Sequence, residues 1–243
     1  MIKTLALILK KQNLGEADRI ITVLTPALGK KRLVARAVRR PLSKLAGHLD
    51  SLMVTQLIIT NKENLPQITS AIMVESFENA RDSLELLGRT YAVGKVAEKL
   101  AEENTPQQSL FQTTVDAFAR INNERNWEAT WLYFLAQLCR QFGVYISNFS
   151  CGSCGQPIIE AARFNIADRA LFHDDHATVA GTRRLSGNSV KLLRLLNKEP
   201  YEKIARIRIP LGEAAEIEEI LLMELIENYS SDPWKKYARL AGS

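Results

Sequence analysis

The chain has 243 residues, of which 46% are hydrophobic, and a net charge of +5. That length favours two domains over one, and the apolar fraction is ample for a folded core. No apolar run approaches the roughly 20 residues that cross a bilayer, and the run at residues 5–9 is too short for a signal peptide, so we expect a cytoplasmic protein with no membrane segment.

Positive charge is concentrated in the first fifty residues. They contain eleven lysines and arginines but only three acids, Glu16, Asp18 and Asp50, which gives +8 and leaves about −3 for the rest of the chain. Such a contrast indicates a basic binding module joined to a near-neutral or acidic scaffold. The alternative is a basic face that is merely solvated.

Residues 1–75 predict five short strands separated by turn signals, at 3–9, 19–25, 32–38, 52–60 and 67–75. The strands are too closely spaced for crossover helices, which indicates a small antiparallel barrel. The OB-fold is the commonest five-stranded barrel that binds oligonucleotides, and an SH3-like barrel fits the pattern nearly as well.

The segment 29–47, GKKRLVARAVRRPLSKLAG, is the candidate binding site. If the third strand continues through it, alternation places five residues on one outward face, namely Arg32, Val34, Arg36, Val38 and Arg40. A row of guanidinium groups suits a polyanion. Residues 1–76 contain no Phe, Tyr or Trp to stack on bases, so we expect phosphate contacts with weak sequence preference. The predicted contacts are Lys30, Lys31, Arg32, Arg36, Arg39, Arg40 and Lys44.

From about residue 77 the apolar spacing becomes helical, through the stretch around Trp131 and again at 189–196 and 212–227. The expected fold class is α+β, with an OB-type five-stranded antiparallel barrel at 1–77 and an α-helical domain at 78–243. The helical domain has a polar insertion at about 150–183. Cys139 lies within a helical stripe of leucines and aromatics, which predicts a buried, inert thiol.

The insertion contains a Cys-x2-Cys pair and a His-x2-His pair separated by eighteen residues. The four side chains, Cys151, Cys154, His173 and His176, match a structural zinc knuckle. Two alternatives remain, a redox-active CxxC and a polar loop without metal. Since four protein ligands leave no open position for water, a catalytic zinc is disfavoured.

No phosphate-binding loop, nucleophile elbow or His-Glu-x2-His motif occurs in the chain, so we expect a protein that is not an enzyme. Two other classes stay open. One is an RNA-binding OB protein of translation or transcription, and the other is a zinc hydrolase or deaminase.

With these motifs placed, the whole chain resembles the bacterial RecO family of DNA repair and recombination mediators. The resemblance includes EADRIITVLTPALGKKRLVARAVRRPLSKLAG, YAVGKVAEKL, PQQSLF, FLAQLCRQFGVYISNFSCGSCG, SVKLLRLL and WKKYARL, in that order. It implies a nucleoid-associated protein that binds single- and double-stranded DNA, anneals complementary strands, and acts with RecR to load RecA. Metal-bearing members of the family commonly have four cysteines, so the His pair departs from the pattern.

The resemblance also implies contact with the acidic tail of the single-strand-binding protein. The candidate residues lie near the end of the chain, where apolar and basic groups alternate. They are Trp234, Lys235, Lys236, Tyr237 and Arg239. The alternative is a terminal helix that packs on the core through its rings and leaves its lysines in water.

Overall fold

The computed structural model describes residues 1–60, 65–123, 126–177 and 181–229. Within the last range, residues 227–229 are described as backbone only. By packing, the chain forms two compact units, residues 1–125 and 126–243. The change of apolar spacing at about residue 77 predicts an earlier boundary. The boundary by packing falls later because the first three helices pack with the sheet. No helix among the described residues is long and apolar enough to cross a membrane.

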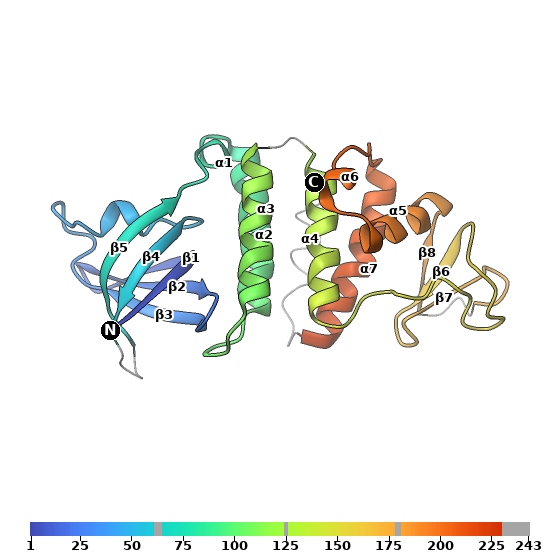
Figure 1. Cartoon of the computed structure of the whole chain (residues 1–243), viewed down its shortest axis with the longest axis horizontal. Coiled ribbons are helices and arrows are strands. Elements are labelled where there is room, and N and C mark those ends of the chain that lie inside the picture. The colour runs from blue at the N-terminus through green and yellow to red at the C-terminus, as the bar shows by residue number, and fades with distance from the viewer. Residues whose placement is uncertain (61–64, 124–125, 178–180, 230–243) are drawn as a thin grey trace. The chain divides into compact units, whose positions relative to one another are not determined.

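The first unit contains a five-stranded antiparallel sheet in the order β3-β2-β1-β4-β5 (Figure 1). The edge strands meet at a single bridge, where the Val34 N–H donates to the Pro66 carbonyl at 2.9 Å. The sheet is compatible with an OB-type barrel although it does not close fully, and the expected α+β class is confirmed. Its elements are β1 (Ile2–Leu14), β2 (Asp18–Thr25), β3 (Gly29–Ala35), the 3-10 helix η1 (Ala46–His48), β4 (Val54–Ile59) and β5 (Ile68–Glu75).

Strand β1 runs through the middle of this sheet and is buried on both faces. Ala6 and Ile8 belong to the core cluster with Ile21 and Leu33. Leu7, on the opposite face by alternation, is equally buried because α2 packs against β1. Each fully buried side chain of this size contributes about 1.5–3 kcal/mol, so the apolar run of β1 anchors the unit.

Strand β3 ends at Ala35, three residues before the predicted end. Pairing with β2 stops at Arg19 opposite Ala35. Ala37 then adopts a left-handed conformation with φ 52°, and its N–H donates to an Asp18 carboxylate oxygen at 2.7 Å. The prediction that Arg36 and Arg40 lie on a strand is therefore wrong, and Val34 and Val38 are buried in place of sharing an outward face with the arginines.

Helices α1 (Glu78–Asp82), α2 (Leu84–Leu100) and α3 (Gln108–Asn123) complete the first unit. Phe77 and Phe118 pack edge to face with ring centres 5.5 Å apart. The loop between α2 and α3 contacts the β2–β3 turn, where the Lys30 N–H donates to the Glu102 carbonyl at 2.9 Å. Gly29, with φ +64°, permits this approach, because a Cβ there would lie 2.1 Å from the Thr105 carbonyl oxygen.

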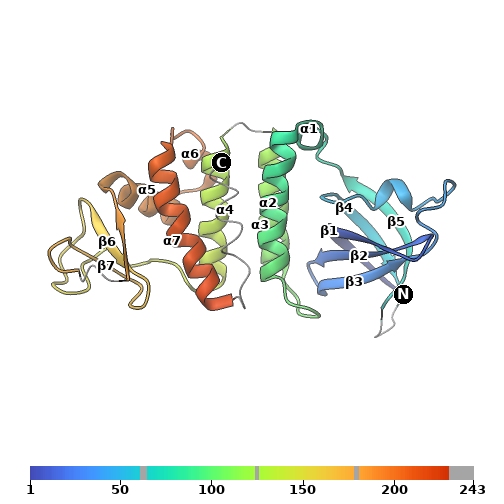
Figure 2. The ribbon, with the colours of Figure 1, turned by 180° about the vertical axis from the view of Figure 1, so that it is seen from behind.

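In the second unit, α4 (Trp127–Gln141) and α7 (Leu211–Tyr229) lie side by side in both views (Figures 1 and 2). Asn126 caps α4 by accepting from the Ala129 N–H at 3.1 Å, and its amide donates to the carbonyls of Ala205 and Ile207. Those carbonyls follow α6 (Tyr201–Ile204), which comes after α5 (Gly187–Lys198). One side chain thus starts a helix and fixes a distant loop.

The polar insertion contains a small three-stranded sheet in the order β7-β6-β8. Its strands are β6 (Ala162–Asn165), β7 (Ala170–Phe172) and β8 (Thr182–Leu185). They are three or four residues long and include Arg163, Arg183 and Arg184. Strands so short and so charged give little alternation signal, which explains why the sequence pattern indicates only a polar segment.

Candidate nucleic-acid interface and metal centre

The seven basic residues predicted to contact nucleic acid all lie in the described part of the first unit. Lys30 and Lys31 are half-buried, and the other five are exposed. None of the seven forms an ion pair with an Asp or Glu among the described residues. Their charges are therefore not neutralised by neighbouring carboxylates within 4 Å.

Lys30, Lys31 and Arg32 form one group, which we call the strand group, on β3. The Lys30 ammonium donates to the Glu98 carbonyl at 3.2 Å, and Lys31 donates to Asn104. Lys10, Thr22 and Arg32 lie in one row across three strands, since Lys10 pairs with Thr22 and Thr22 with Arg32. They help to line a hollow of about 260 Å³ with Gln12, Lys30, Glu98 and Glu103.

Arg36, Arg39, Arg40 and Lys44 form a second group, the loop group, between β3 and η1. The Arg39 guanidinium donates to the Gly15 carbonyl at 3.1 Å, which places it against the β1–β2 turn. Arg36 lies beside Gln67, whose amide oxygen, when turned toward it, accepts at 3.1 and 3.2 Å. Arg36 follows the last residue of β3, and the chain turns after it at the left-handed Ala37, so the cations form two groups and not one row along a strand.

Sequence reasoning missed Lys10, Gln12 and Thr22 as neighbours of the strand group. Strand pairing brings them together, and the register between β1 and β2 shifts at a bulge between Ile8 and Lys10. Because a one-residue shift reverses which face a side chain occupies, alternation along the sequence could not identify them. The only sequence feature that indicated an additional cation near this site was the pair Lys10 and Lys11, which follows the apolar run of the first predicted strand.

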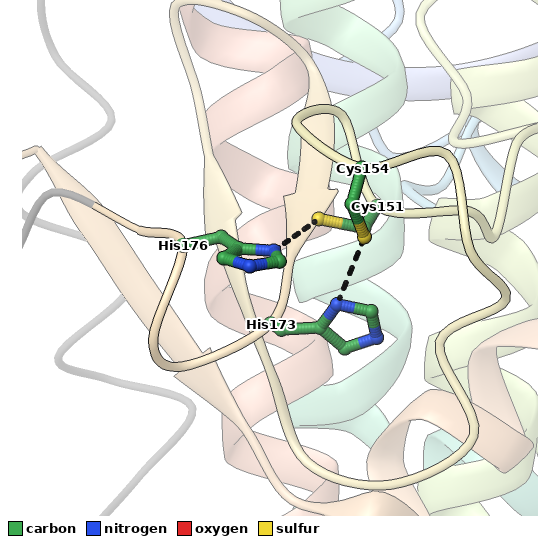
Figure 3. Close-up of side chains that lie close together, drawn as sticks. All are labelled: Cys151, Cys154, His173 and His176. Atoms are coloured by element: carbon green, nitrogen blue, oxygen red, sulfur yellow. Dashed lines mark hydrogen bonds between the residues drawn. The ribbon is translucent and has the colours of Figure 1, made fainter.

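The four predicted metal ligands come together in the second unit. The donor atoms of Cys151, Cys154, His173 and His176 all lie within 4.8 Å of one another. Figure 3 shows the two contacts between pairs, Cys151 Sγ to His176 Nδ1 and Cys154 Sγ to His173 Nδ1, each at 3.5 Å. Tetrahedral coordination with Zn–S of about 2.3 Å and Zn–N of about 2.0–2.1 Å requires about 3.6 Å between sulfur and nitrogen. These residues could hold a metal ion.

Backbone hydrogen bonds fix the turn that carries the two cysteines. The Gly155 N–H donates to the Cys151 carbonyl at 2.9 Å, and Gly155 has a φ of +72° that favours glycine. The Gly152 N–H donates to the Leu171 carbonyl at 2.8 Å, which joins this turn to β7. The turn and the small sheet thus place both thiols beside the histidine segment.

The histidine segment is held by charges that flank the ligands. Asp174 forms ion pairs with Arg163 of β6 at 2.9 Å and Arg184 of β8 at 3.6 Å. The His176 N–H donates to the His173 carbonyl at 3.0 Å, which closes a turn between the two ligands. This arrangement orients both imidazoles toward the thiols.

The environment favours the thiolate form of Cys151. Burial opposes ionisation, but hydrogen bonds from the backbone of Cys154, His173 and Ser153 and from the His176 ring together lower the pKa of Cys151 to about 6. The hydrogen bond to Cys151 raises the pKa of His176. A thiolate is the form that binds metal.

Other predicted residues have separate outcomes. Cys139 is fully buried in α4, which confirms the predicted burial, and burial raises the pKa of its thiol, which favours the unreactive protonated form. The predicted partner-binding residues Trp234, Lys235, Lys236, Tyr237 and Arg239 lie outside the described residues.

The two units define a class of protein, one with a basic OB-type sheet followed by a helical unit that contains a Cys2His2 cluster able to hold a metal ion. Two family models match the chain, "Recombination protein O N terminal" at residues 1–77 and "Recombination protein O C terminal" at 81–238. The chain therefore belongs to the RecO family of DNA repair proteins, and this membership supports a role in recombinational repair.

Relatives from several bacteria are named DNA repair protein RecO. The protein of Roseiflexus sp. strain RS-1 is 32% identical over 237 residues, which cover 95% of this chain and 82% of the relative. That of Dehalococcoides mccartyi strain ATCC BAA-2266 is 28% identical over 217 residues, covering 89% and 86%. That of Prosthecochloris aestuarii is 26% identical over 243 residues, covering 94% and 90%. The similarity thus extends over both units.

Proposed function

We propose that this chain binds single- and double-stranded DNA through the strand and loop groups of its first unit, promotes annealing of complementary strands, and helps RecR to load RecA. The proposal contains no catalytic step. It rests on family membership together with seven basic residues that lack ion-pair partners among the described residues. The expected setting is the nucleoid, in the cytoplasm.

The contrast with other cations of the same unit supports the choice of these residues. Arg89 pairs with Glu85 at 2.6 Å and Lys95 pairs with Glu98 at 2.7 Å, one cation to each carboxylate. A cation already paired with a carboxylate gains less from a phosphate, since the existing pair must be broken or shared. The unpaired cations lose no such interaction when they bind.

The test is the salt dependence of binding to a single-stranded oligonucleotide, measured by fluorescence anisotropy. Five to seven phosphate contacts predict a slope of log K against log salt of roughly −3.5 to −5, at about −0.7 per contact. Replacing the loop group by glutamine, in the variant Arg36→Gln, Arg39→Gln, Arg40→Gln, Lys44→Gln, removes up to four contacts. The slope should become shallower by up to about 2.8, and annealing should slow.

A matched control removes four positive charges from the second unit, at Lys191, Lys198, Arg206 and Arg208. All four side chains are exposed and have no ion-pair partner in the described part of the chain. The control should keep nearly the full slope. Equal slopes for the two variants would contradict the assignment of the loop group, and an affinity insensitive to salt would contradict phosphate binding altogether.

We further propose that the Cys2His2 cluster binds Zn²⁺ with Cys151, Cys154, His173 and His176 as ligands. A bound ion would hold the cysteine turn and the histidine segment together, and so stabilise the insertion. The Sγ to Nδ1 distances of 3.5 Å support a tetrahedral site.

The acidic tail of the single-strand-binding protein is the proposed ligand of Trp234, Lys235, Lys236, Tyr237 and Arg239. The double variant Lys235→Glu, Lys236→Glu should therefore weaken binding of the tail peptide.

A further inference from the structure

A second hollow in the first unit lies apart from the strand and loop groups. Its volume is about 190 Å³, and its lining comes from β1, from the loop before β4, and from α1 and α2. The lining residues are Lys11, Asp50, Ser51, Arg81, Leu87 and Tyr91. The hollow thus combines two cations, one acid and one aromatic ring.

The cations of this hollow are held by a single carboxylate. Asp50 Oδ1 pairs with the Lys11 ammonium, and Asp50 Oδ2 pairs with Arg81 Nη2 at 3.2 Å. Burial raises the pKa of Asp50, but the hydrogen bonds and charges of Lys11 and Arg81 outweigh it and lower the pKa, so the carboxylate is charged at neutral pH. Two cations against one anion leave a net charge of +1.

Arg81 also has an unused hydrogen-bond donor. Its Nη1 atom is buried and has no hydrogen-bond partner among the described residues. Such a donor is costly to leave unsatisfied, but because it is buried, a ligand in the hollow would contact the accessible part of the Arg81 side chain, which is 30% exposed. The hydroxyl of Ser51 offers another donor in the same lining.

The opposite wall is apolar and aromatic. Leu87 and Tyr91 are four residues apart on α2 and so lie on one face of the helix. The Tyr91 side chain is 42% exposed and has no ring or hydrogen-bond partner within the described ranges. Residues 1–76 contain no Phe, Tyr or Trp for stacking, but α2 brings a tyrosine to the hollow that Lys11 of β1 also lines.

The loop that contains Asp50 and Ser51 continues into a strained residue, Leu52. Leu52 follows Ser51 and has a φ of 65°, a conformation that L-residues other than asparagine and aspartate rarely adopt. Its N–H donates to the Ile8 carbonyl at 2.7 Å, and a Cβ on Gly94 would come within 3.3 Å of its side chain. Gly94 is three residues beyond Tyr91, so the strained residue fixes the loop on α2. Strain of this kind is concentrated at functional sites.

We propose that this hollow is a nucleotide subsite for single-stranded DNA. A backbone phosphate is bound by Lys11, Arg81 and Ser51, and the attached base stacks on Tyr91 beside Leu87. The inference rests on the proposed DNA binding and adds a base contact to it. A base can stack there only when it is unpaired, so the subsite distinguishes single strands from duplexes.

The first test compares Tyr91→Leu with the wild-type chain. The probes are a fluorescent oligothymidylate, an abasic chain of the same length, and a duplex. Loss of one stacked base, about 1–3 kcal/mol, should weaken oligothymidylate binding by about 5- to 150-fold while leaving the other two affinities and the salt slope unchanged. The control is Tyr145→Leu, which replaces a tyrosine with 44% exposure in the second unit. Tyr91→Phe should restore binding because the ring remains.

The second test addresses the phosphate. The triple variant Lys11→Gln, Asp50→Asn, Arg81→Gln removes both cations together with their shared carboxylate and should make the salt slope shallower by about 0.7. The control Glu85→Gln, Arg89→Gln removes another ion pair of α2, 2.6 Å long, and should leave the slope unchanged. Circular dichroism and the unfolding midpoint establish that each variant is folded.

A third test needs no substitution. Irradiating the wild-type chain with an oligothymidylate containing 5-iododeoxyuridine should attach the nucleotide to Tyr91, as mass spectrometry of the peptides would show. Failure of the wild-type chain to bind any probe would remove the proposed function itself. Normal DNA binding with no effect of Tyr91→Leu and no adduct at Tyr91 would overturn the subsite alone. A second outcome would also overturn the subsite: Tyr91→Leu weakens binding of an acidic peptide but does not change the affinity for oligothymidylate.

Discussion

Replacing Gly29 by alanine tests how the β2–β3 turn is attached to the α2–α3 loop. An alanine at φ +64° costs about 1–2 kcal/mol through its conformation alone. Its Cβ would also lie 2.1 Å from the Thr105 carbonyl oxygen and 2.8 Å from that of Glu102. Both atoms belong to the backbone, so the loop must move away from the turn.

That movement removes backbone hydrogen bonds. The Lys30 N–H bond to Glu102 and the Gln107 N–H bond to Pro26, at 2.9 and 3.0 Å, join the turn to the loop. At about 0.5–1.5 kcal/mol each, their loss and the conformational cost together predict that Gly29→Ala lowers the free energy of unfolding by about 2–5 kcal/mol. Urea denaturation should show a lower midpoint with an unchanged slope.

Gly15 provides the matched control. It also lies in a turn between strands, with φ +59°, but a Cβ there would meet no atom within 4 Å. Gly15→Ala should therefore cost only the conformational part, about 1–2 kcal/mol. Equal destabilisation by the two substitutions would refute the contact between turn and loop.

Three further predictions concern the second unit and the Asp50 ion pairs. Asn126→Ala should lower the free energy of unfolding by about 2–4 kcal/mol, since it removes a cap and two bonds to loop carbonyls. Ser83→Ala, which removes only the cap of α2, should cost about 1 kcal/mol in the same denaturation assay. The purified chain should contain one zinc by mass spectrometry, and Cys154→Ser should abolish it and lower the unfolding midpoint. Retained metal, or an unchanged midpoint without metal, would contradict a stabilising zinc site. The stability difference between the wild-type chain and Asp50→Asn should be constant at neutral pH. Because the folded pKa of Asp50 lies below its ordinary 3.8, that difference should shrink as pH falls through and below 3.8. A difference that grew in acid would have the wrong sign.

The sheet was accessible to sequence reasoning because its signal is local. Apolar alternation and turn residues give the five strands, and each predicted strand overlaps one of β1 to β5. The end of β3 was not accessible. Alternation of arginine and valine continues through Val38, but the left-handed Ala37 and its bond to Asp18 end the pairing. That bond joins residues nineteen positions apart, and no local pattern encodes it.

The proximity of Cys151, Cys154, His173 and His176 could be predicted from the sequence because the spacing of the two pairs indicates it. Two pairs of soft ligands at knuckle spacing are rare in a chain with three cysteines and three histidines. The hollow around Tyr91 could not be predicted, since its six residues come from four elements and their proximity depends on packing. Lys11, Asp50 and Arg81 are unremarkable charges in the sequence, and only the fold makes them neighbours.

The separation of the two basic groups bears on how the proposed function would operate. At about 3.3 Å per residue, the chain from Lys30 to Arg36, the residue after the end of β3, spans at most roughly 20 Å, or about six phosphates at 3.4 Å along one strand of a duplex. A nucleic acid that contacts both groups would then lie along the strand, with its phosphates bound at two ends and the bases between them free of aromatic stacking on β3. Bases held in this way remain available for pairing with a second strand. A footprint of fewer than about six nucleotides with the full salt slope would show that only one group is used.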